Sequence, residues 1–573
     1  MSKNALAARI FFEVADFLEL EGVAWKPVAY RNAARSIEAL DEAVEDVYAR
    51  GGEKALKGIP GVGDAIAKKL AEIIETGKLK YHAELKKEFP FDMESLTGIP
   101  GIGPKKAKKL FDALGVKDRR GLRKAALARK VRGVEGFDEK TEENILRGIE
   151  LVEKSAGRVP LGYVLHDVNQ LIGKMKRLAP VTRIIAAGST RRMKETIGDI
   201  DILATSSDPK GVMDAFTALP EAGHVVAKGE TRSTITLKTG LNCDLRVVSE
   251  DEYGSALQYL TGSKEHSVEL RKIAISRGLK LNEYGVFRGG KRVAGKTEEG
   301  VYRALGMDYI EPELRELNGE IKAAQKHELP ELVGLNEIRG DFHVHSDWSD
   351  GSSPILGMAK AAGARGYEYV AITDHAGKLK IAGGLDEKGL ERHSAAVEEA
   401  EKEAGGIRLL KGAEVDITKD GGLAVSAAAL KRLDFVVASV HSNFNMPEKE
   451  MTARYVKAIE GKAVHAIGHP GCREIGARNA VKADFGKVYE AAAGNGVFLE
   501  INAFPTRMDL WDREIKRAKY EFGAQFVLGT DSHNEGHLRF METGVGMARR
   551  GWAEKQDLVN SLSFKELSKK LGI

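Results

Sequence analysis

The chain has 573 residues, of which 43% are hydrophobic and 30% charged, and its formal net charge is +4 at pH 7. This length exceeds what one hydrophobic core usually organises, so about four domains of ~150 residues are expected, and the composition excludes a disordered or fibrous protein. Cys243 and Cys472 cannot form a disulfide framework, which favours a cytoplasmic location, and no apolar stretch approaches the roughly 20 residues that cross a membrane.

Two segments near the N-terminus repeat each other about 40 residues apart. Gly-Ile-Pro-Gly-Val-Gly at 58–63 and Gly-Ile-Pro-Gly-Ile-Gly at 98–103 each precede a lysine-containing run. The glycines permit a tight turn that opens a helix, where free backbone N–H groups and nearby lysines can meet a phosphate. The pattern resembles the helix-hairpin-helix motif, which holds the DNA backbone without recognising sequence, although two plain helix caps would also fit it. The residues expected to contact DNA here are Gly61, Gly63, Gly101, Gly103, Lys105 and Lys106.

The excess of basic residues lies in the same part of the chain. Residues 1–337 hold 55 basic and 51 acidic residues, whereas residues 338–573 hold 33 of each. The stretch 104–132 contains twelve Lys or Arg and only two acids, a density that attracts a phosphate backbone by displacing its counterions. A weaker third copy of the glycine motif begins at Gly133. The neighbouring motifs favour DNA binding over the alternative, a solvated helix face.

From about residue 159 the pattern changes to short strands mixed with helices, with strands predicted at 183–187, 199–203, 233–237 and 242–248. Asp199 and Asp201 lie on the same face of a strand, because strand side chains alternate with a period of two. Asp244 supplies a third carboxylate if its strand lies beside the first. Three such aspartates can hold two Mg²⁺ or Mn²⁺ ions, as in-line phosphoryl transfer requires.

A Gly-Ser turn at 188–189, followed by Arg192, offers donors for a triphosphate. With these motifs, residues 1 to about 320 resemble the family X DNA polymerases. Tyr-Leu-Thr-Gly-Ser at 259–263 is similar to the family segment that shapes the sugar pocket, with Leu260 in place of an aromatic residue. Arg271 stands where the family contacts the template minor groove, twelve residues before Glu283 in an Asn-Glu-Tyr segment. The nucleotide-binding residues so implied are Gly188, Ser189, Arg192, Gly198, Tyr259, Gly262 and Lys264.

The resemblance implies a DNA-directed DNA polymerase that fills short gaps in DNA repair, such as base excision repair. Its partners would be gapped or nicked DNA and dNTPs, and we expect a monomer. The fold expected is multidomain α/β. Its polymerase part would comprise a helical helix-hairpin-helix domain at 1–88, a second such domain or fingers at 89–158, a nucleotidyltransferase palm at 159–250 and a thumb at 251–322.

Lys69 follows the first glycine motif by one helical turn. It aligns with the lysine that forms a Schiff base in the family's deoxyribose-phosphate lyases, and Tyr30-Arg31 resembles a neighbouring family segment. A lysine among other cations can have its pKa lowered enough to act as a nucleophile. Phosphate binding without chemistry is the alternative, and both remain open.

After a linker predicted at 323–337, strands and helices alternate regularly. Seven strands predict a distorted TIM-like (βα)7 barrel over 338–573, whose active site would lie at the carboxyl ends of the strands. Residues able to bind metal occur at these ends. Mixed His and carboxylate ligation suits Zn²⁺ or Mn²⁺ better than Mg²⁺, and up to three ions fit nine ligands. The candidate ligands are His343, His345, Asp350, His375, Glu414, His441, His469, Asp531 and His533.

The His-x-His-Ser, Ser-Asp-Gly, Thr-Asp-His, Gly-His-Pro and Asp-Ser-His elements resemble the PHP phosphoesterase family. This resemblance implies phosphoester hydrolysis: a 3′-5′ exonuclease, with abasic-site cleavage or 3′-phosphate removal as further activities. A structural barrel or a small-molecule phosphatase is the alternative, and a non-catalytic DNA-binding scaffold is a third hypothesis. His393, His465 and His537 are expected to be ordinary helix or core residues, and Cys472 a buried thiol.

Overall fold

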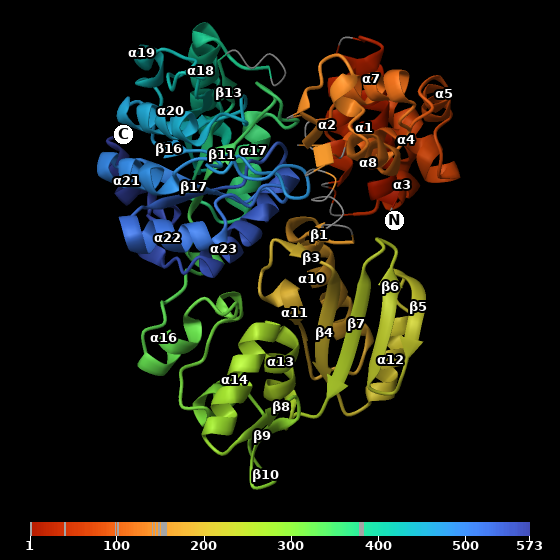
Figure 1. Ribbon diagram of the computed structural model, residues 1–573, viewed down its shortest axis with the longest axis vertical. Helices are drawn as coiled ribbons and strands as arrows, with labels where there is room; N and C mark the ends of the chain where they lie inside the picture. Colours follow the sequence, from red (N-terminus) through yellow and green to blue (C-terminus); the bar gives the residue numbers. More distant parts are fainter. Residues whose placement is uncertain are drawn as a thin grey trace.

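The computed structural model describes all residues except 1–2, 24, 39, 41, 98, 100–101, 140, 144, 147–148, 150–156 and 378–382. Four regions follow one another along the chain: a helical region, a five-stranded sheet, a small α/β region and a barrel (Figure 1). The helical region, red to orange, lies beside the barrel, green to blue, and the other two regions lie below them (Figure 1). No helix in the described part is long and apolar enough to cross a membrane.

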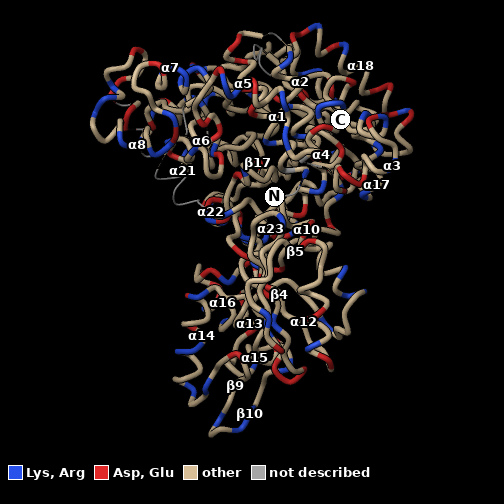
Figure 2. The backbone as a smooth tube through the Cα atoms, turned by 90° about the vertical axis from the view of Figure 1, so that its right-hand side faces the viewer, with Lys and Arg blue, Asp and Glu red and all other residues tan. Residues whose placement is uncertain are grey.

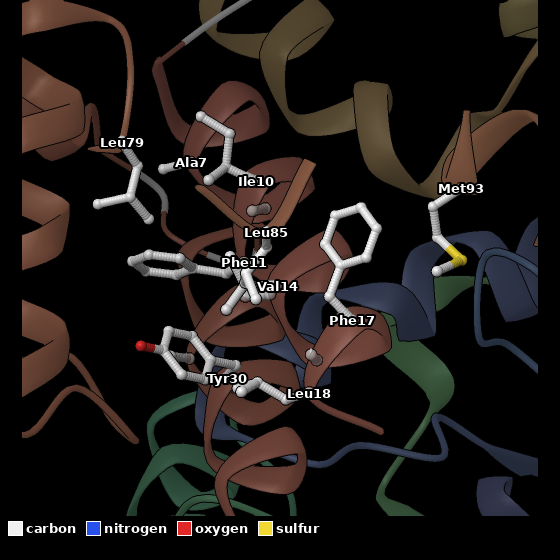
Figure 3. Close-up of a cluster of buried hydrophobic side chains, with 14 of the residues drawn as sticks. Ala7, Ile10, Phe11, Val14, Phe17, Leu18, Tyr30, Leu79, Leu85 and Met93 are labelled. Carbon is white, nitrogen blue, oxygen red and sulfur yellow. The ribbon is translucent and has the colours of Figure 1, made fainter. Parts of the chain in front are cut away.

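The N-terminal helices pack around one hydrophobic core that draws on residues from Ala7 to Ile149. Phe11 and Phe17 on the first helix reach into this core, and Tyr30 meets Phe11 edge to face with ring centroids 5.5 Å apart (Figure 3). The two helix-hairpin-helix units predicted at 1–88 and 89–158 therefore share a core. The helices are α1 Lys3–Leu20, α2 Lys26–Glu38, α3 Val44–Leu56, α4 Asp64–Thr76, α5 Lys80–Glu88, α6 Met93–Thr97, α7 Pro104–Leu114 and α8 Arg119–Leu127.

Both glycine motifs precede a helix, as predicted. α4 begins directly after Gly63, and α7 begins directly after Gly103 with Pro104 at its first position. Gly61 has a φ of +75°, a backbone conformation that favours glycine. Gly101 lies outside the described residues. Lysine and arginine line α7 and α8, where the sequence has its densest basic run (Figure 2).

The second region is a mixed sheet in the order β2-β4-β7-β6-β5. β4 and β7 are parallel, and Asp201 pairs in register with Asp244. Along β4, Ile200 and Ile202 are buried while Asp199 and Asp201 reach the other face, which confirms the predicted alternation. The elements are β1 Val159–Pro160, α10 Leu161–Leu178, β2 Arg183–Ala186, α11 Gly188–Arg191, β3 Thr196–Ile197, β4 Asp199–Thr205, α12 Pro209–Thr217, β5 Ala222–Lys228, β6 Arg232–Leu237 and β7 Asn242–Val248.

The third region joins four α-helices to a three-stranded antiparallel sheet. The predicted linker at 323–337 was wrong in its first residues, because α16 continues to Lys326 and Ala324 is buried in this region's core. Val333 is already buried in the core of the barrel. The elements are α13 Tyr253–Thr261, α14 Lys264–Ser276, β8 Lys280–Asn282, β9 Gly285–Arg288, β10 Lys291–Ala294, α15 Glu298–Ala304 and α16 Glu320–Lys326.

The C-terminal region is the predicted seven-stranded parallel barrel, in the order β11-β12-β14-β15-β16-β17-β18 with short β13 beside β14. A parallel bridge between Val344 at the end of the first strand and Ser532, three residues after the last strand, brings the two edges of the sheet together. The strands are β11 Gly340–Val344, β12 Tyr369–Ile372, β13 His375–Ala376, β14 Arg408–Asp416, β15 Phe435–Ser439, β16 Ala466–Ile467, β17 Phe498–Asn502 and β18 Phe526–Gly529. The helices are α17 Ile355–Ala364, α18 Glu387–Glu403, α19 Ala427–Leu430, α20 Glu448–Glu460, α21 Phe485–Asn495, α22 Asp512–Phe522, α23 Met541–Arg550 and α24 Phe564–Leu571.

Candidate active sites

The first candidate site lies on the five-stranded sheet, where three aspartates meet. Thr234 on β6 donates a hydrogen bond to Asp244, and Arg232 lies 3.4 Å from the same carboxylate. Burial and the negative charges of Asp199 and Asp244 raise the pKa of Asp201 to about 6. Because the negative charges of Asp199 and Asp244 oppose ionisation of Asp201, a divalent cation among the three carboxylates would be stabilising.

The Gly-Ser turn approaches these carboxylates closely. Gly188 has a φ of +58°, and a Cβ atom there would lie 2.1 Å from Oδ2 of Asp201, so only glycine fits. Arg192 follows the turn and points toward α13: its guanidinium donates to the carbonyl of Thr261 and lies 2.9 Å from Glu316. Arg192 of the five-stranded sheet region therefore contacts the segment 259–263 of the third region, and both were predicted to bind the nucleotide.

Other predicted nucleotide and DNA residues surround this contact. Gly262 has a φ of +73° and lies beside the Arg192 guanidinium. Lys264 is the first residue of α14, which Ser263 caps by accepting the N–H of His266 at 3.2 Å. Tyr259 is 42% exposed, so its ring is accessible. Arg271 lies two turns further along α14 and donates to the carbonyl of Ser267. The remaining predicted residues, Ser189 in α11 and Gly198 just before β4, lie on the same sheet region.

The second candidate site lies at the carboxyl ends of the barrel strands, where all nine predicted ligands come together. Glu414 is central: its carboxylate lies 2.9 Å from His375, 3.1 Å from His441 and 3.0 Å from His469. His345 lies 3.2 Å from Asp531, and His533 lies 3.3 Å from Asp350. In the described part of the chain, three groups of residues each offer one potential metal-binding atom per residue, and the atoms of a group all lie within 4.8 Å of one another. The groups are His345, Asp350, His375 and His533; His343, His345 and Glu414; and His375, Glu414 and His441.

Burial and mutual charge shape the ionisation of this cluster. Burial opposes ionisation of Glu414, but the neighbouring imidazoles outweigh it and hold the pKa of this carboxyl well below its usual range. Burial likewise opposes protonation of His343, yet Glu500 and Glu414 raise its pKa well above the usual value. Burial lowers the pKa of His469 to about 3, so its imidazole is neutral near pH 7. The site thus combines carboxylates and imidazoles in a dry environment.

These residues fit a metal centre. Nε2 of His343 and both ring nitrogens of His345 are buried, and none of these three atoms has a hydrogen-bond partner in the part of the chain that the structure describes. Buried polar atoms normally have a partner, so unpartnered nitrogens that converge with carboxylates indicate a ligand. Imidazole and carboxylate donors together suit a transition-metal ion or Zn²⁺.

The residues that orient these ligands were not predicted from the sequence. Glu500 on β17 lies 2.7 Å from Nδ1 of His343, and Asp416 on β14 lies 2.6 Å from Nδ1 of His441. Arg507 lies 3.2 Å from Asp531. An acid in the otherwise apolar run Val-Phe-Leu-Glu-Ile at 497–501 was the available signal for Glu500. Such partners fix the ring orientation of a metal-binding histidine.

The histidines that were not assigned to metal have other partners. His393 lies 2.9 Å from Asp374, His465 accepts the N–H of Val436, and His537 packs against Phe504. Cys472 is buried beside Tyr455. None belongs to the three groups of ligand atoms found in the described residues.

Lys69 on α4 lies between two tyrosines. Its Nζ hydrogen-bonds the Tyr30 hydroxyl and lies 4.2 Å from the centroid of the Tyr81 ring. Burial lowers the pKa of this amine from its usual value. The surroundings therefore favour a neutral amine more than those of an exposed lysine do.

Protein-family models match three of the four regions: the helical region, the small α/β region and the barrel. Residues 2–79 match a helix-hairpin-helix domain and residues 93–150 a SAM-like helix-hairpin-helix tandem. Residues 256–316 match the DNA polymerase beta thumb, and residues 341–504 match the PHP domain. The two helix-hairpin-helix matches both lie in the helical region, and none of the four matches covers the five-stranded sheet.

Curated proteins match the chain over different lengths. It is 35% identical over 564 residues to the DNA polymerase/3′-5′ exonuclease PolX of Bacillus subtilis, an alignment that covers 98% of this chain and 97% of that protein. It is 24% identical over 334 residues to DNA polymerase lambda of Rattus norvegicus, covering 53% of this chain and 54% of that protein. It is 35% identical over 201 residues to a probable phosphatase of Acetivibrio thermocellus, covering 34% of this chain and 78% of that protein. The first alignment takes in both candidate sites.

Proposed function

The chain belongs to the family of the DNA polymerase/3′-5′ exonuclease PolX, and we propose that it fills short gaps during DNA repair and trims 3′ ends. Synthesis occurs at the aspartates of the five-stranded sheet, and hydrolysis occurs in the barrel. The observation that carries this proposal is the presence of two separate carboxylate-containing centres in one chain with helix-hairpin-helix motifs.

At the polymerase centre, Asp199, Asp201 and Asp244 hold Mg²⁺ or Mn²⁺, and the Gly188 turn and Arg192 hold the triphosphate. Two such metal ions, when bound, would neutralise the negative charge of the triphosphate and activate the primer 3′-hydroxyl. The raised pKa of Asp201 supports this assignment, because it reflects crowded carboxylates that a cation would relieve. Lys264 and Tyr259 contact the incoming nucleotide, and Arg271 the template.

At the barrel centre, Glu414 and the eight other predicted ligands hold Zn²⁺ or Mn²⁺, up to three ions. When bound, such ions lower the pKa of a coordinated water and neutralise the phosphate. The residues of the chain orient the site: Glu500 fixes the ring of His343, and Asp416 fixes the ring of His441. Excision of nucleotides from a DNA 3′ end is the reaction we assign, and cleavage at abasic sites and removal of 3′-phosphates use the same centre.

One observation favours a second candidate function for the barrel. A probable phosphatase aligns with only 201 residues, 34% of this chain, and residues 341–504 of the barrel match the PHP domain, so a small phosphomonoester is the alternative substrate. Such a barrel would hydrolyse a free phosphomonoester and leave DNA unshortened.

The partners we propose are gapped or nicked DNA and dNTPs, bound by a monomer in the cytoplasm. The exposed glycines at 61, 63 and 103 and the lysines at 105 and 106 would hold the DNA backbone. Two buried free thiols, Cys243 and Cys472, support a reducing compartment. Lys69 contributes a deoxyribose-phosphate lyase activity in this proposal, supported by its lowered pKa.

A denaturing gel of a 5′-labelled primer on gapped DNA tests the proposal. With Mn²⁺, the primer should lengthen when dNTPs are present and shorten when they are absent. Asp199→Ala should abolish lengthening alone, and His343→Ala shortening alone. Lengthening without any shortening would favour the phosphatase alternative, and loss of both activities from either substitution would contradict separate sites.

A further inference from the structure

A charge network joins the barrel to the predicted nucleotide pocket. Arg550, the last residue of α23, donates to the carbonyl of Arg192 at 2.9 Å and to Oε1 of Glu316 at 3.1 Å. Nε of Arg192 donates to the same Oε1 at 2.9 Å. Two arginines, one from the barrel and one from the pocket, therefore share one carboxylate oxygen.

The barrel holds Arg550 firmly. Its side chain is only 2% exposed, and its other guanidinium nitrogen pairs with Asp512, the first residue of α22. The α23 backbone also packs against the pocket segment, since a Cβ atom on Gly546 would lie 2.9 Å from Cβ of Met193. A buried guanidinium with several acceptors is fixed in orientation, because losing any acceptor would leave a donor unsatisfied.

The carboxylate of Glu316 restrains Arg192 but does not occupy all of the N–H donors of the Arg192 guanidinium. Burial opposes ionisation of Glu316, but Arg550, Arg192 and Lys194 outweigh it and hold the pKa of Glu316 below its usual range. Nη1 of Arg192 donates to the Thr261 carbonyl, whereas Nη2 has no hydrogen-bond partner among the described residues. One end of the guanidinium fork thus stays available for a phosphate oxygen.

We propose that Arg550 is a positioning residue of the nucleotide pocket: through Glu316 and the carbonyl of Arg192, the barrel holds the Arg192 guanidinium in place for the triphosphate of an incoming dNTP. Without Arg550, the Glu316 carboxylate would bind Arg192 more strongly and compete with the triphosphate. The exonuclease domain thereby sets the nucleotide affinity of the polymerase. This inference rests on the role proposed above for Arg192.

Single-nucleotide insertion into gapped DNA tests this inference, with KM for dNTP and kcat measured separately. Arg550→Met should raise KM about tenfold and leave kcat nearly unchanged, because one charge-assisted contact is lost. Arg550→Lys keeps the positive charge but loses the planar guanidinium, so its KM should lie between those of the wild type and Arg550→Met. In a Glu316→Gln background, Arg550→Met should have a much smaller effect, since the coupling runs through that carboxylate.

Arg549→Met is the matched control. Arg549 is adjacent on α23 and pairs with Glu313 at 2.7 Å, so its loss removes an ion pair at the same interface without touching Glu316. An equal rise in KM for Arg549→Met, or no rise for Arg550→Met and Arg550→Lys, would overturn the inference. Excision of a primer without dNTPs reports whether each variant is folded.

Arg192→Ala separates this inference from the function on which it rests. If Arg192→Ala leaves KM unchanged, the assignment of Arg192 itself is wrong. If Arg192→Ala raises KM while folded Arg550→Lys does not, only the role of Arg550 is wrong.

Discussion

Asp201 and Asp244 stand directly opposite each other on the parallel strands β4 and β7. Because burial and its two acidic neighbours raise the pKa of Asp201 to about 6 from the usual 3.8, the folded protein binds this proton more tightly than the unfolded chain. The stabilisation is therefore complete below pH 3.8 and is lost as the pH rises through about 6.

Asp201→Asn should consequently stabilise the metal-free protein at pH 8, by at most about 3 kcal/mol for a shift of this size. The gain should shrink toward pH 4, where the wild-type carboxyl is also protonated. Thermal melting in the presence of a chelator, repeated across this pH range, measures the difference. A variant that melts at or below the wild-type temperature at pH 8 would show that the three carboxylates do not strain the sheet.

Glu414→Gln should reduce 3′-5′ excision at least about 100-fold and leave primer extension intact, because Glu414 contacts three of the predicted histidine ligands at 3.1 Å or less. Excision of a labelled primer and the metal content of the purified protein measure the effect. Glu399→Gln, an exposed residue on α18 paired with Lys402, is the control and should change neither. Full excision by Glu414→Gln would remove this residue from the centre.

Glu500→Gln should weaken metal binding about 10–100-fold while the nine ligands stay in place. The amide keeps the size of the side chain but lowers the basicity it confers on His343, which it contacts at 2.7 Å. Titration of the excision rate with Mn²⁺ should show a higher half-saturating concentration and a similar maximal rate. An unchanged titration curve would mean that Glu500 serves packing alone.

Lys69 should form a borohydride-trappable adduct with DNA carrying a 5′-deoxyribose phosphate. Because burial lowers the pKa of its amine, the yield should rise with pH and level off below pH 10.5, the usual value for lysine. Lys69→Ala should lose the adduct, whereas Lys68→Ala, an exposed neighbour on α4, should keep it. An adduct that persists in Lys69→Ala would leave phosphate binding as the role of this lysine.

Much of both sites follows from short-range patterns in the sequence. The period of two along β4 correctly placed Asp199 and Asp201 on one face, and the positions after barrel strands correctly placed His441 and His469. These predictions succeed because strand geometry fixes side-chain direction locally.

What the sequence did not predict depends on contacts between distant segments. Glu500 and Asp416 are acids within strands, and only the closed barrel shows which imidazole each one meets. The helical start of the predicted linker was missed because packing of Ala324 into the neighbouring core stabilises that turn. No local pattern connects Arg550 with Arg192, which lie 358 positions apart.

The single core of the helical region has a mechanical consequence for the two glycine motifs. Since one set of buried side chains from Ala7 to Ile149 supports both α4 and α7, the shared packing restrains the starts of these two helices relative to each other. The separation between the N-terminal ends of α4 and α7 is therefore set when the chain folds, before DNA binds. If both helix starts hold the DNA backbone, the fold sets the separation of the two backbone positions that they contact, whatever the base sequence.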